Sequence, residues 1–134
     1  MVKLTKVEGI GKAYAEKLEA IGIVSTDALL EKGATPQGRK EIAEKTGISP
    51  KLVLRWVNHV DLFRIKGVGE EYADLLETAG VDTVPELAQR NPENLHKKIV
   101  AINADKKLVR QLPGLNQVRE WVEQAKRLPR KITH

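Results

Sequence analysis

Two short glycine-rich segments have the residue types and spacing that best suit binding chemistry in this chain. The first is Gly9–Gly11, with the sequence Gly-Ile-Gly, and the second is Gly67–Gly69, with the sequence Gly-Val-Gly. Glycine enters left-handed backbone conformations without a Cβ clash, so each segment can reverse the chain sharply. A helix that begins directly afterwards exposes N–H groups without internal partners, and its dipole favours an anion there. Each segment therefore predicts a tight hairpin whose amides can approach a phosphate.

We call residues 7–11 the first hairpin and residues 65–69 the second hairpin. The candidate phosphate-binding residues are the glycines, the apolar residues between them and the nearest lysines, namely Gly9, Ile10, Gly11, Lys12, Lys6, Gly67, Val68, Gly69 and Lys66. The residues that follow the glycines differ. Lys12 stands at the expected helix N-terminus in the first copy, whereas Glu70 and Glu71 stand there in the second. Carboxylates stabilise that helix end but repel a phosphate. We expect the first hairpin to be the better phosphate contact and the second to be partly or wholly structural.

Both hairpins belong to an internal repeat. Residues 7–23 and 65–81 align with seven identical positions, and a later match places Trp56 over Trp121. A repeated unit of about sixty residues indicates two similar half-domains or one pseudo-twofold domain. We expect a first repeat over residues 1–64 and a second repeat, with a basic C-terminal segment, over residues 65–134.

The spacing of apolar residues predicts helices throughout the chain. Apolar residues recur at spacings of three and four, and no useful β-type alternation is present. The predicted helix starts are marked by capping residues, and the predicted stops by glycines: Ser25, Thr35, Ser49 and Asn91 for starts, and Gly22, Gly33, Gly47 and Gly80 for stops. We therefore expect an all-α protein of about ten short helices, with two hairpin-containing repeats packed as one compact helical unit. Each tryptophan is either a base-stacking platform or a core residue, and its place on an apolar stripe favours the core.

Composition narrows the class of protein. The chain is 41% hydrophobic and 31% charged, which disfavours disorder, and it has no cysteine, which excludes disulfides and cysteine metal sites. The net charge is +5, and residues 95–134 carry ten Lys or Arg against three acidic residues. This segment either attracts a polyanion or forms a solvated face. Without a membrane-span pattern or a signal peptide, the sequence predicts a cytoplasmic protein with no membrane partner.

The sequence shows no catalytic set, so we expect a protein that is not an enzyme, with no cofactor and no metal site. The histidines are scattered, and His59 is expected at a helix surface or boundary rather than as a ligand. The segment Gly9–Lys12 lacks the strand, glycine spacing and hydroxyl residue of a phosphate-binding P-loop.

The segments "VEGIGKAYAEKL" and "IKGVGEEYADLL" resemble the helix-hairpin-helix motif, and residues 65–95 and 112–128 resemble a bacterial family, domain of unknown function 4332. The motif resemblance implies two helix-hairpin-helix-containing repeats. It also implies that the candidate residues of the hairpins bind nucleic acid, with DNA favoured, through backbone amides and a nearby Lys or Arg and without sequence preference. The first hairpin is then expected to be the better DNA contact. The two hairpins lie 58 residues apart, farther than in proteins that grip both strands with paired hairpins, which disfavours a symmetric clamp. Such motifs also serve as packing modules. The alternative function is therefore a protein-interaction or structural module with degenerate hairpins, and the oligomeric state is left open.

Overall fold

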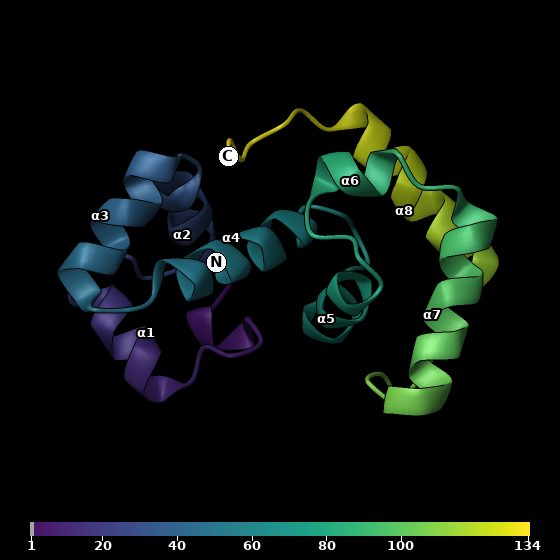
Figure 1. Ribbon diagram of the computed structural model, residues 1–134, viewed down its shortest axis with the longest axis horizontal. Coiled ribbons are helices and arrows are strands. Elements are labelled where there is room, and N and C mark those ends of the chain that lie inside the picture. The colour runs from purple at the N-terminus through teal and green to yellow at the C-terminus, as the bar shows by residue number, and fades with distance from the viewer. Residues whose placement is uncertain (1) are drawn as a thin grey trace. The chain divides into compact units, whose positions relative to one another are not determined.

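The computed structural model describes residues 2–134. It confirms the all-α fold class that the sequence predicts. Within these residues the chain forms eight α-helices and one short 3-10 helix, joined by short loops without a strand (Figure 1). In chain order the elements are η1 (Leu4–Lys6), α1 (Lys12–Glu19), α2 (Thr26–Gly33), α3 (Pro36–Thr46), α4 (Pro50–Leu62), α5 (Glu70–Thr78), α6 (Val84–Ala88), α7 (Pro92–Lys106) and α8 (Leu115–Arg127). None of the helices in the described residues is long and apolar enough to cross a bilayer.

The compact packing is distributed over two units. The first unit comprises Met1–Asp61 together with Lys131–His134, and the second comprises Leu62–Arg130. The change from one unit to the other thus falls close to the repeat boundary expected after residue 64. The last four residues, which the sequence pattern assigned to the second repeat, belong to the first unit.

The helix starts show why local sequence signals predicted them well. The side chains of Ser25, Thr35 and Asn91 accept hydrogen bonds from the backbone N–H three residues further on, over 3.1, 3.0 and 2.9 Å. Pro36 and Pro92 then occupy the first helical position, where a missing N–H costs nothing. Capping of this kind satisfies N–H groups that the helix itself leaves without partners.

The first unit has a core of aliphatic residues that surrounds one tryptophan. Fully buried side chains include Leu18 of α1, Leu29 of α2, Ile42 of α3 and Trp56 of α4. Helices α2 and α4 approach so closely at Gly33 that an added Cβ would lie 2.5 Å from a methyl carbon of Val57. The absence of a side chain at this glycine therefore lets the two helices meet.

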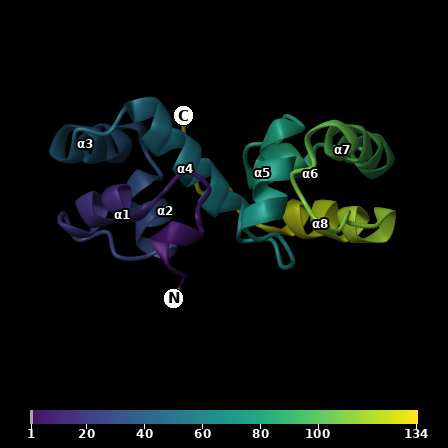
Figure 2. The same cartoon turned by 90° about the horizontal axis from the view of Figure 1, so that it is seen from below.

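The second unit places α8 against α6 and α7 (Figure 2). Helix α8 carries a narrow apolar stripe, formed by Val118, Trp121, Val122 and Ala125, and all four side chains are buried. Spacings of three and four put these residues on one face of the helix, as the sequence pattern predicts.

The C-terminal residues pack on the first unit through a contact that the sequence pattern did not indicate. Ile132 is buried, and the Thr133 N–H donates to the Ala34 carbonyl over 2.8 Å. The Arg39 guanidinium donates from Nη2 to the Thr133 carbonyl over 2.7 Å and from Nη1 to the Gly33 carbonyl over 2.8 Å. These bonds hold the end of the chain against the connection between α2 and α3.

Candidate nucleic-acid interface

The first hairpin reverses the chain between η1 and α1. Gly9 has a φ of +93°, a conformation that L side chains rarely adopt, and the Ile10 N–H donates to the Val7 carbonyl over 3.0 Å. Ile10 is buried, so the residue between the glycines points into the unit and fixes the turn. Gly11 is extended and forms the N-cap of α1. The turn therefore delivers the chain directly into a helix N-terminus.

The second hairpin has the same backbone geometry. Gly67 has a φ of +92°, and the Val68 N–H donates to the Ile65 carbonyl over 3.1 Å. Val68 is buried, and Gly69 is the extended N-cap of α5. The shared glycine pattern thus reflects a shared backbone requirement in the two units.

A buried tryptophan packs behind each hairpin. Trp56 contacts the Tyr14 ring at a centroid distance of 5.0 Å, and Trp121 contacts the Tyr72 ring at 5.3 Å. The tryptophans are 0% and 1% exposed. Neither indole is accessible to a nucleic-acid base, so both are core residues, as their helical positions favoured.

The start of α1 is open to an anion. Its N-cap makes no side-chain hydrogen bond, and the first turn contains no acidic residue. A Cβ added at Gly11 would meet no atom of the described residues within 4 Å, so the space beside this N-cap residue is open. Lys12, the first residue of α1, and Lys6, the last residue of η1, are both exposed. The first N–H groups of a helix lack internal partners and the helix dipole favours an anion there, and Lys12 adds a positive charge at this end.

The start of α5 has the same open backbone but the opposite charge. Its N-cap is also without a side-chain hydrogen bond, and nothing lies within 4 Å of a Cβ added at Gly69. However, Glu70 and Glu71 occupy the first turn, and Arg110 reaches the Glu71 carboxylate only at 3.9 Å. The carboxylates complement the helix dipole at the place where a phosphate would approach.

The second hairpin is also tied to α8 through its backbone. The Gln124 side chain accepts from the Lys66 N–H over 2.9 Å and donates to the Lys66 carbonyl over 3.4 Å. Lys66 is exposed, but its amide is already used within the unit. The sequence pattern does not predict these two hydrogen bonds, because Lys66 and Gln124 lie 58 positions apart.

Part of the basic C-terminal segment is neutralised within the second unit. Arg119 of α8 pairs with Glu93 of α7 at 2.8 Å, and Lys126 pairs with Glu123 at 3.3 Å. Four lysines of α7 and its C-cap face solvent and have no ion-pair partner in residues 2–134, namely Lys97, Lys98, Lys106 and Lys107. The segment therefore combines structural ion pairs with a solvated basic face.

His59 corrects one expectation from the sequence. It is 1% exposed rather than at the surface, because it lies three residues after Trp56 on the buried face of α4. No cluster of three or more His, Asp or Glu side chains that could hold a metal ion occurs in the part of the chain that the structure describes.

The helices, the two compact units and the paired glycine hairpins define an all-α protein with two similar candidate binding elements. The sequence also identifies the protein family. The chain belongs to the family described as a domain of unknown function, DUF4332, whose model matches residues 8–128. No solved structure significantly matches the chain.

Proposed function

We propose that this protein binds nucleic acid, with DNA favoured, without sequence preference and without catalysis, through the first hairpin. The observation that carries the proposal is the uncapped N-terminus of α1, which has no acidic residue in its first turn and has Lys12 exposed at its first position. Backbone amides and Lys6 supply further donors to phosphate oxygens. Contacts of this kind fix a protein on the duplex but carry no sequence information.

The second hairpin contributes little or nothing to binding in this proposal. Glu70 and Glu71 add negative charge at the start of α5, and Gln124 occupies the Lys66 amide. A cytoplasmic location suits this function and stays a prediction of the sequence.

A fluorescence-anisotropy titration with a labelled DNA duplex tests the proposal. With about four to six phosphate contacts, affinity should fall roughly a hundredfold or more between about 50 and 200 mM salt. Single-stranded DNA and RNA of the same length, titrated in parallel, establish which nucleic acid is preferred.

The matched variants are Lys12→Glu and Lys66→Glu, because both lysines are exposed beside a glycine hairpin and the charge change is identical. The first should weaken binding at least tenfold more than the second, since one reversed charge faces an open helix end. Equal or negligible losses, or an affinity that does not depend on salt, would contradict the proposal.

Binding of a protein partner is the second candidate function. A pocket in the first unit, lined by apolar and basic side chains, favours it. The two functions use different residues, so they can be tested separately.

A further inference from the structure

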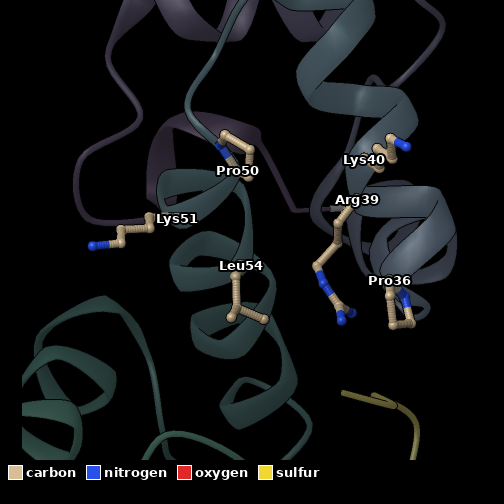
Figure 3. A pocket seen from close by; sticks show the side chains of 6 residues that line it. All are labelled: Pro36, Arg39, Lys40, Pro50, Lys51 and Leu54. Carbon is tan, nitrogen blue, oxygen red and sulfur yellow. The ribbon is translucent and has the colours of Figure 1, made fainter.

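A pocket of about 300 Å³ lies in the first unit between the N-terminal parts of α3 and α4 (Figure 3). Its lining consists of three apolar and three basic residues, namely Pro36, Pro50, Leu54, Arg39, Lys40 and Lys51. Pro36 and Pro50 are the first residues of their helices, so the positive ends of two helix dipoles lie beside the pocket. Among the described residues, no acidic side chain lines the pocket.

Arg39 is a buried cation without a counter-ion in the part of the chain that the structure describes. It is 7% exposed, and no carboxylate of the described residues lies within ion-pair distance of it. Its two hydrogen bonds go to the neutral carbonyl oxygens of Gly33 and Thr133. Since a guanidinium has five N–H donors, the Nε–H and one hydrogen on each terminal nitrogen have no acceptor within residues 2–134. Buried charges are normally paired, so this group favours an anion supplied from outside.

The charges around the pocket have the same sign. Figure 3 shows the Arg39 guanidinium between Leu54 and Pro36, with the ammonium groups of Lys40 and Lys51 pointing outward on opposite sides. Both lysines are exposed, and neither makes an ion pair with a described residue. Glu41, the residue after Lys40, is held elsewhere by Lys45 at 2.7 Å and Lys32 at 3.2 Å.

We propose that this pocket binds an acidic, leucine-containing segment of a partner protein, with a carboxylate on Arg39 and an aliphatic side chain against Leu54. A planar guanidinium pairs with a carboxylate through two parallel hydrogen bonds, which fixes the orientation of the bound group. The prolines and Leu54 offer apolar surface, which a peptide side chain can cover and a phosphate backbone cannot. None of the residues that line the pocket belongs to either hairpin.

The test is an NMR titration of the full ¹⁵N-labelled chain with the peptide GELELG, compared with the neutral peptide GQLQLG and the basic peptide GKLKLG. GELELG should shift the amide signals of Arg39, Lys40, Lys51 and Leu54, and the other two peptides should shift them far less. No shift with GELELG, or equal shifts with GQLQLG, overturns the proposal.

The double variant Lys40→Glu/Lys51→Glu should weaken GELELG binding about tenfold or more, since two favourable charge interactions become repulsive. Lys106→Glu/Lys107→Glu is the matched control, because these exposed lysines change the net charge equally and do not line the pocket. An equal loss in both double variants shows a general charge effect and overturns the proposal.

Arg39→Lys tests the guanidinium separately. It should weaken binding of GELELG about fivefold or more, because lysine keeps the charge but cannot donate two parallel hydrogen bonds to one carboxylate. Its thermal unfolding is measured beside it, since Arg39 also holds the C-terminal residues. If a DNA duplex shifts the four pocket amides more strongly than GELELG does, the pocket is a phosphate site and the peptide proposal is wrong.

Discussion

In the first unit the indole of Trp56 closes over Gly9, so that a Cβ added to Gly9 would lie 3.1 Å from Trp56 Nε1. The second unit repeats this relationship, with 3.2 Å between an added Cβ at Gly67 and Trp121 Nε1. Both glycines also have a φ above +90°. Glycine is therefore required at Gly9 and Gly67 for two reasons: the backbone conformation excludes most side chains, and the tryptophan behind the hairpin leaves little room for one.

We predict that Gly9→Ala and Gly67→Ala each lower the free energy of unfolding by about 1–3 kcal/mol, because alanine must enter a left-handed conformation and press on an indole. Thermal unfolding followed by circular dichroism measures the loss. Gly22→Ala is the matched control for Gly9→Ala, since Gly22 has a φ of +90° but nothing within 4 Å of an added Cβ. It should cost less, and an equal cost would show that the tryptophan contact contributes nothing.

We predict that Gly11→Ser separates binding from stability. Serine is a good N-cap residue whose hydroxyl accepts from the first-turn amides, so it should leave the thermal midpoint unchanged or raise it slightly. The same hydroxyl would occupy the amides that a phosphate needs, so affinity for duplex DNA should fall several-fold. Gly69→Ser is the matched change in the second hairpin and should leave the affinity unchanged. Parallel anisotropy and thermal measurements check both variants, and unchanged binding by Gly11→Ser would argue against amide contacts.

The hairpins were predictable because their determinants are local. A glycine with positive φ, a buried residue at Ile10 or Val68 and an N-cap glycine all lie within five residues, so the sequence pattern specifies the backbone directly. The sequence pattern likewise predicts Lys12 and Glu70 at helix N-termini, and they are the first residues of α1 and α5. Local rules of this kind succeed when every contact involved is close in sequence.

The missed features depend on contacts between distant parts of the chain. Gln124 binds the backbone of Lys66, and Arg39 binds the carbonyl of Thr133, 94 residues away. The sequence of α3 around Arg39 is typical of an exposed helix face, so it does not predict that the Arg39 side chain is buried. His59 was misplaced for a related reason, because a polar residue on an apolar stripe can face either the core or its edge.

We predict that Glu70→Lys/Glu71→Lys raises the affinity of the protein for duplex DNA several-fold. The change removes two repulsive charges from the start of α5 and places lysine where the first hairpin has Lys12. Loss of the favourable carboxylate–dipole interaction should lower the free energy of unfolding by about 0.5–2 kcal/mol in total. An anisotropy titration checks the gain in affinity. The control is Glu16→Lys/Glu19→Lys, which adds the same charge on exposed α1 positions outside the first turn. If both variants gain equally, net charge rather than the helix N-terminus controls binding.

We predict that Gly38→Ala strongly destabilises the first unit, by about 2–4 kcal/mol. An added Cβ would lie 1.9 Å from the Lys32 carbonyl oxygen and 3.2 Å from Thr35 Oγ1, so either α3 must move or the cap on its first turn must break. Gly114→Ala is the control, because a Cβ there meets nothing within 4 Å. Chemical denaturation should show a large shift for the first variant and a small one for the second. Similar shifts would mean that the connection between α2 and α3 relaxes freely.

The ion pair between α7 and α8 gives a prediction about pH. The Arg119 side chain donates to Glu93 Oε1 from Nη2 over 2.8 Å and from Nε over 3.2 Å, and this holds the pKa of Glu93 below its ordinary value of 4.5. A carboxyl whose pKa is lowered by folding stabilises the native state above its unfolded pKa, and this contribution is lost as the pH falls from 4.5 through the lowered value. In Arg119→Gln the Glu93 pKa should therefore rise towards 4.5, and the acid-induced part of the stability loss should shrink. Carboxyl ¹³C titration by NMR measures the pKa directly. Glu41, whose pKa is lowered by hydrogen bonds from Lys45 and Lys32, should titrate identically in both proteins. An unchanged Glu93 titration in Arg119→Gln would show that the pair is open in solution and does not link the two helices.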